Sequence, residues 1–326
     1  MTGIDDAALL AVVAIVSALG ASALPRASWP RRSPAAAILL WQALGLASGL
    51  AAVGALIGLA LPASQGGLVL SVLRAAGLLR DGDVLGLAGL FGLNGADGGL
   101  LVVFAVRLAC LAAGLALLAL LCWVLLAASI AALQARRRQR ALLTLLAHGD
   151  PKVPGALVVD YPSAAAYCLP GLRSQIVVSA GTLRLLGHGE LAAVLAHERA
   201  HLRERHDLVL LPFTALRRAF PRSATCTGAQ RSVALLVEML ADDRALRGGP
   251  ARELVSALVR FGTAGACPAP AGALAAAGAI GAPEGEMAAR VARLLQPVRP
   301  LPRPAIAAIC LAAALLVAAP VTLLII

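Results

Sequence analysis

The sequence contains few charged residues, few aromatic residues and almost no lysine. Of its 326 residues 14% are charged and 3% are aromatic, whereas 60% are hydrophobic. Soluble domains carry about 25% charged residues, so this composition favours a membrane protein over an ordinary soluble domain. Lys152 is the only lysine among 28 basic residues, which means that arginine carries the net charge of +11.

The chain also lacks closely spaced cysteines and aromatic residues next to basic ones. Its six cysteines form no C-x-x-C pair, which argues against a disulfide framework or a cysteine zinc knuckle. The net charge alone would suggest nucleic acid, but no basic patch with interleaved aromatics accompanies it. We therefore expect no direct nucleic-acid partner, and basic loops beside membrane spans account for the charge.

Four apolar stretches are long enough to cross a lipid bilayer, which takes about 20 residues. They run from Ala7 to Leu24, from Ala35 to Leu61, from Leu100 to Leu133 and from Ala305 to Ile326. Acidic residues precede the first stretch in place of a basic leader, so we interpret it as a retained span. The third is too long for one crossing, and its helix is expected to project beyond the headgroups. The prediction is a membrane region at 1–134 with three transmembrane helices, and a fourth helix at 304–326.

The distribution of arginine predicts how the chain crosses the membrane. Arginines cluster between the first two spans (Arg26, Arg31 and Arg32) and again directly after the third, at 136–140. In the loop at 62–99, by contrast, three aspartates offset two arginines. The positive-inside rule then places the N-terminus and this loop outside, and residues 135–303 in the cytoplasm. We expect a plain connecting loop at 62–99, with a position on the membrane surface as the alternative.

The cytoplasmic segment is long enough to bury a core of its own. Its pattern of apolar residues, glycines and prolines predicts an α+β domain. The expected strands cover 156–159, 165–169 and 175–179; the expected helices cover 135–146, 189–205, 208–220, 231–247 and 286–295, with a linker at 262–283.

The strongest motif is H-E-x-x-H, formed by His197, Glu198 and His201. Side chains four residues apart project from one face of a helix, where two imidazoles can hold one zinc ion. Glu198 lies about 100° around the helix, where a general base for a water at the metal belongs. The alternative is a solvated helix with charges paired across turns, but a chance match is rare in a chain with five histidines.

Glu238 is the candidate for the third ligand. It lies in the apolar run at 235–240, an unfavourable place for an unpaired carboxylate. Asp242 is four residues further on, on the same helix face, and can accept a hydrogen bond from the far nitrogen of a ligand histidine. The alternative to a zinc site is that Glu238 and Asp242 are charged residues on the protein surface. His206 should face away from His197 if the helix continues, which favours a surface or supporting position over a ligand.

The stretches LAAVLAHERAHLRERHD and LVEMLADDRAL, after three spans and before a fourth, resemble the BlaR/MecR-type membrane metallopeptidases. The resemblance implies an α-helical membrane protein with a cytoplasmic gluzincin-like zinc peptidase domain at 135–303. It also implies an endopeptidase that cleaves a cytoplasmic protein, with a transcriptional repressor as the family's expected substrate. His197, His201 and Glu238 match the family's zinc ligands, Glu198 its catalytic base, and Asp242 the aspartate after the ligand glutamate.

The resemblance also implies that the strands at 165–179 line the substrate cleft and can pair with an extended peptide. It does not extend to an extracellular penicillin-binding domain, so sensing of beta-lactams is not carried over. HtpX-type membrane quality-control proteases, which share H-E-x-x-H, are the nearest alternative. A zinc-stabilised signalling scaffold without turnover is a second one. Tyr161, Tyr167 and Arg244 are candidates for stabilising an oxyanion, and the sequence does not define the oligomeric state.

Overall fold

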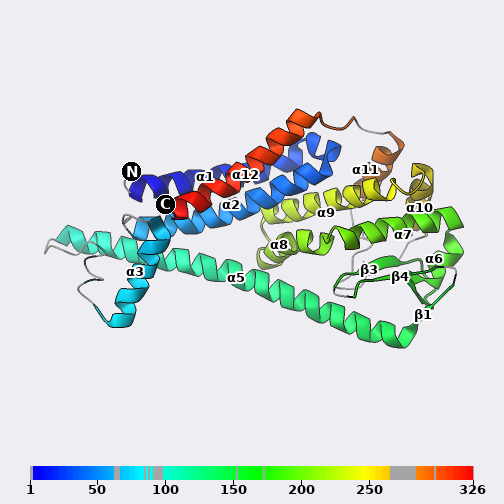
Figure 1. The fold of residues 1–326 in the computed structure, drawn as a ribbon, viewed down its shortest axis with the longest axis horizontal. Coiled ribbons are helices and arrows are strands. Elements are labelled where there is room, and N and C mark those ends of the chain that lie inside the picture. Colours follow the sequence, from blue (N-terminus) through cyan, green and yellow to red (C-terminus); the bar gives the residue numbers. More distant parts are fainter. Residues whose placement is uncertain are drawn as a thin grey trace. The chain divides into compact units, whose positions relative to one another are not determined.

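The computed structural model describes residues 3–61, 67–83, 86, 89, 91, 98–151, 153–171, 173–264, 284–296 and 299–325 (Figure 1). The chain divides into two compact units. The first comprises Met1–Ala27, Leu39–Val124 and Pro302–Ile326; the second comprises Ser28–Ile38 and Leu125–Leu301.

Long apolar helices form the first unit. They are α1 (Gly3–Ala23), α2 (Pro34–Ala60) from Leu39 onward, the first part of α5 (Gly98–Leu146), and α12 (Arg303–Ile325). Within the described ranges, four helices are long and apolar enough to cross a membrane, which agrees with the four predicted stretches. Small residues allow close packing: a side chain added at Gly114 would meet Ile57 at 2.8 Å, the kind of contact that brings membrane helices together.

The predicted outer loop contains a helix. Residues Gly67–Asp81 form α3, which packs against α12. The expectation of a plain connecting loop was wrong for this stretch, because it contains no proline and its leucines and valines recur at helical spacing. Most of the remaining loop lies outside the described residues, as does most of the predicted linker at 262–283.

A four-stranded mixed sheet forms one side of the second unit. Its strands are β1 (Ala147–Gly149), β2 (Leu157–Val159), β3 (Ala166–Leu169) and β4 (Gln175–Ser179), in the order β1-β2-β4-β3. β2 and β4 are parallel, and the other two pairs are antiparallel. β3 is therefore an edge strand. β1 was not predicted, since three residues are too few to show an alternating pattern.

Side chains alternate between the two faces of this sheet, and both faces are covered. Ala166, Cys168 and Val178 lie in a core shared with α7 (His188–Arg203) and α10 (Ala251–Thr263). Tyr167 and Val177 point to the other face, where they pack with Leu143 of α5. This double burial explains why β3 and β4 read as continuous apolar runs in the sequence.

The other helices are α6 (Ala180–Leu185), α8 (His206–Ala219), α9 (Ala224–Ala245) and α11 (Glu284–Leu295). α9 begins at Ala224 instead of the predicted Arg231, because Ser223 caps it by accepting a hydrogen bond from the Cys226 amide. α6 and α10 were not predicted. The signal for α10 was present: Leu254, Leu258 and Phe261 recur at helical spacing after Pro250, and all three are buried.

Polar contacts attach the end of α5 to the rest of the second unit. The Gln139 amide donates to the Tyr167 hydroxyl at 2.9 Å, and Arg140 donates to the Pro170 carbonyl at 3.1 Å. Arg136 pairs with Asp207, at the start of α8, at 3.1 Å. The Asp207 side chain is only 3% exposed, so Arg136 offsets the cost of burying this carboxylate.

We predict that Arg136→Met destabilises the protein more than Asp207→Asn does. The first change leaves a buried carboxylate without its cation, which costs about 3–5 kcal/mol, whereas the second leaves a partly exposed arginine. Thermal unfolding of the detergent-solubilised chain measures both. The double variant should recover part of the loss, and equal effects of the two single changes would contradict a buried ion pair.

Candidate metal centre

Helix α7, which carries the H-E-x-x-H motif, is anchored at its first turn. The Glu190 carboxylate accepts the Gly187 amide at 2.7 Å, pairs with Arg260 at 3.0 Å and accepts the Ser256 hydroxyl. The partners on α10 therefore fix the start of the helix. Further along, His197, Glu198 and His201 are all fully buried, with 0% exposure. The alternative of a solvent-exposed helix face is therefore wrong for these three residues.

The structure brings His197, His201 and Glu238 together. Nε2 of His197 lies 3.0 Å from Nε2 of His201, and the Glu238 carboxylate oxygens lie 3.4 Å and 3.5 Å from these two nitrogens. Ligand atoms about 2.0–2.1 Å from a tetrahedral zinc ion are about 3.4 Å apart. Two imidazole nitrogens and one carboxylate at these separations fit a zinc ion, and this is the group among the described residues that can hold a metal.

Asp242 and Arg290 contact the residues of this group on the side away from the metal position. Oδ1 of Asp242 lies 2.9 Å from Nδ1 of His197, which leaves Nε2 of that ring directed at the metal position. Arg290, from α11, donates to both Asp242 oxygens at 2.7 Å and 2.9 Å and lies 3.0 Å from Glu238. Hydrogen bonds of this kind orient metal ligands and set their tautomers.

The charges in this network determine the protonation states. Burial opposes a charge on His197, but its hydrogen bonds to the Asp242 and Glu238 carboxylates, together with their charges, outweigh burial and raise its pKa to about 9. Burial lowers the pKa of His201 to about 3, which keeps that imidazole neutral. Burial alone would raise the pKa values of Glu238 and Asp242, but Arg290 lowers both, so both carboxylates are ionised and available as acceptors.

His206 does not face away from the site, as the sequence had suggested. It is 1% exposed, and its Nδ1 lies 2.9 Å from Nδ1 of His201. The prediction failed because it extended α7 by 100° per residue, whereas α7 ends at Arg203 and Arg205 adopts a left-handed conformation with φ 52°. The chain turns there, and His206 begins α8 against the ring of His201.

Cys168 in β3 is the neighbour of Glu198. Burial, the Glu198 charge and a hydrogen bond to its carboxylate together raise the pKa of the Cys168 thiol, which therefore stays protonated and donates to Glu198. Glu198, the predicted base, therefore extends from α7 toward β3, the edge strand of the sheet. No functional role for Cys168 was predicted from the sequence.

The residues suggested for stabilising an oxyanion are not gathered at this site. The Tyr167 hydroxyl accepts from Gln139 on the face of the sheet that packs against α5. Arg244 pairs with Glu204, and Tyr161 is 45% exposed. Arg290 is the functional candidate that the sequence did not show, because it is 48 residues from Asp242.

Comparisons with known proteins agree with this chemistry. Residues 130–242 match the model of peptidase family M48. A stretch of 58 residues is 41% identical to a protein of Aeropyrum pernix described as "Protease HtpX homolog". This stretch covers 18% of the chain and 18% of that relative. No solved structure matches the chain. Together with the apolar helices, these matches support a membrane metallopeptidase.

We predict that His206→Ala weakens zinc binding about 10–100-fold, the usual cost of removing a residue that orients a metal ligand. Without His206, nothing fixes the proton on Nδ1 of His201 that leaves Nε2 free for the metal. Competition with a zinc-binding dye on the purified chain measures the affinity. His188→Ala, at the exposed start of α7, is the matched control, and identical affinities in the two variants would exclude an orienting role for His206.

Proposed function

We propose that this protein is a zinc endopeptidase of the membrane that cleaves protein substrates in the cytoplasm. The observation that carries the proposal is the buried group of His197, His201 and Glu238 next to Glu198. A site with three protein ligands keeps a coordination position for water or substrate, as catalytic zinc sites do.

The same observation weighs against a zinc-stabilised scaffold. A structural zinc site is closed by a fourth protein ligand, and no fourth His, Cys, Asp or Glu joins the group within the described ranges. The Glu238 side chain is 18% exposed, whereas both histidines are fully buried. Glu238 is therefore the ligand of the group that lies nearest to solvent.

Each residue has a definite part in peptide hydrolysis. A bound zinc ion would act as a Lewis acid toward the peptide carbonyl and make a water molecule more acidic. Glu198 takes the proton of the attacking water and passes it to the amine that leaves. Asp242 holds the His197 ring, while Arg290 keeps the Glu238 carboxylate ionised.

The edge strand β3 is our candidate for positioning the peptide. It pairs only with β4 in the sheet, and its residue Cys168 lies against Glu198. An extended peptide that adds to this edge through main-chain hydrogen bonds would run past the catalytic base. Recognition through the main chain tolerates many sequences, which suits an HtpX-like quality-control protease better than an enzyme with a single repressor substrate.

We predict that Glu198→Gln keeps the metal but lowers the cleavage rate at least about 100-fold, because the proton acceptor is gone. His201→Ala should lose both metal and cleavage. The measurements are metal content by mass spectrometry and hydrolysis of an unfolded reporter protein by the purified chain in vesicles. Glu253→Gln, outside the site, is the control. Cleavage by Glu198→Gln at the rate of the unchanged chain would rule out the peptidase.

The cytoplasmic position of the peptidase rests on the arginine distribution, and cysteine labelling tests it. We predict that a cysteine at exposed Ser174 is protected from an impermeant thiol reagent in intact cells, whereas one at exposed Asp81 reacts. Both signals are read above that of the parent chain, and permeabilised cells should label Ser174→Cys fully. The opposite pattern would place the substrates outside the cell.

A further inference from the structure

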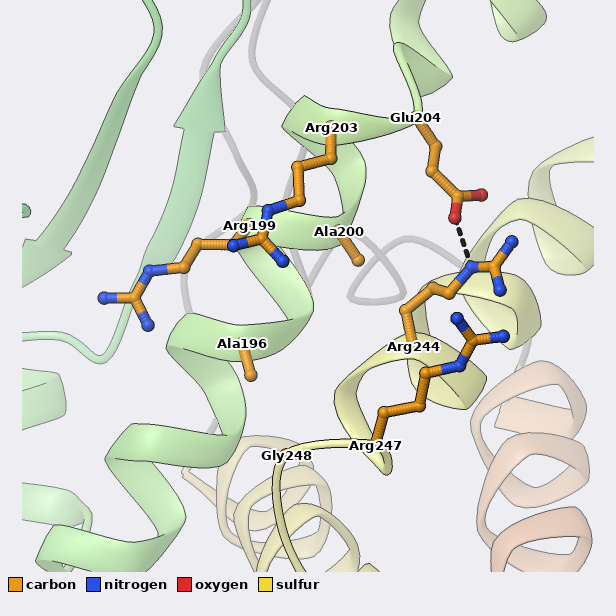
Figure 2. Close-up of a pocket in the computed structure, with 8 residues that line it drawn as sticks. All are labelled: Ala196, Arg199, Ala200, Arg203, Glu204, Arg244, Arg247 and Gly248. Carbon is orange, nitrogen blue, oxygen red and sulfur yellow. Dashed lines mark hydrogen bonds and ion pairs between the residues drawn. The ribbon is translucent and has the colours of Figure 1, made fainter.

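A cavity of about 540 Å³ lies between α7 and the C-terminal end of α9 (Figure 2). Ala196 and Ala200 of α7 leave room for it because their side chains are small. Arg203 lines it from α7, Arg244 from α9, and Arg247 from the turn that follows α9. Figure 2 shows Arg244 and Arg247 side by side, whereas Arg199, which also lines the cavity, extends away from both.

The arginines of this pocket outnumber its single carboxylate. Elsewhere in the domain, Arg136, Arg260 and Arg293 each have a carboxylate partner. In the pocket, Glu204 pairs with Nε of Arg244. No carboxylate of the described residues pairs with Arg203 or Arg247. The pocket therefore has an excess of positive charge and free guanidinium donors.

The pocket is separate from the side of α7 that carries the catalytic base. At 100° per residue, Arg203 lies about 140° around the helix from Glu198. Glu198 faces Cys168 of the sheet, whereas the pocket opens toward the end of α9. A ligand in the pocket would therefore leave the predicted peptide path along β3 free.

We propose that this pocket binds a phosphate group, supplied either by a soluble compound or by an acidic phospholipid headgroup. Guanidinium groups present paired N–H donors that match the oxygens of a phosphate. A cavity of about 540 Å³ is larger than one phosphate requires, so it also holds part of the molecule that carries the phosphate. The proposal does not depend on peptidase activity.

Isothermal titration calorimetry of the zinc-loaded full chain with inorganic phosphate tests the proposal. Arg203→Gln and Arg247→Gln should each weaken binding about tenfold, because each removes a charge-assisted contact without breaking an ion pair. Arg222→Gln removes the same charge at an exposed position outside the pocket and should bind phosphate like the unchanged chain. Phosphate held at the metal would be insensitive to all three changes.

The source of the phosphate is distinguished by reconstitution into phosphatidylcholine vesicles that contain either phosphatidylglycerol or oleate at equal surface charge. Weaker binding of inorganic phosphate with phosphatidylglycerol than with oleate indicates that a lipid headgroup occupies the pocket. Equal binding in both indicates a soluble ligand. If Arg203→Gln and Arg247→Gln bind phosphate as tightly as Arg222→Gln, the proposal is wrong.

Discussion

The buried guanidinium of Arg290 is the charge on which the site depends. It is 1% exposed and pairs with both Glu238 and Asp242. Two carboxylates four residues apart on one helix repel each other, and burial favours their protonated forms. A protonated Glu238 is a poor metal ligand, and a protonated Asp242 would not hold the His197 ring as an acceptor. The site is therefore complete only when α11 is packed against α9, which couples folding of the domain to metal binding.

The same helix makes further contacts one turn along. Arg293 pairs with Asp243 and donates to the Arg31 carbonyl, which connects α11 to the segment between α1 and α2. Arg32 of that segment donates to the Arg299 carbonyl, in the chain that leads into α12. A shift of α11 would change the separation between Arg290 and the carboxylates of α9. Because charge interactions in a buried site vary steeply with distance, such a shift would alter the metal site directly.

The parts of the site that could be predicted are those fixed within one helix. His197 and His201, or Glu238 and Asp242, share a face whatever the rest of the chain does. Arg290 could not be found in this way because its position depends on tertiary packing. His206 was misplaced because a single left-handed residue, Arg205, ends the helical repeat. The apolar pattern indicated the strands correctly, but it could not show that Cys168 would meet Glu198.

Glu204 lies between the proposed phosphate pocket and the metal centre. Glu204 pairs with Arg244 in the pocket, and its other oxygen lies 3.6 Å from Nε2 of His206, whose Nδ1 contacts His201. An anion that takes hydrogen bonds from Arg244 competes with Glu204 for that arginine. A Glu204 carboxylate released in this way would be free to move toward Nε2 of His206, whose Nδ1 contacts His201. Position alone does not establish coupling between two sites. Coupling requires a contact that differs between two states, and here that contact is the one Glu204 makes with either Arg244 or His206.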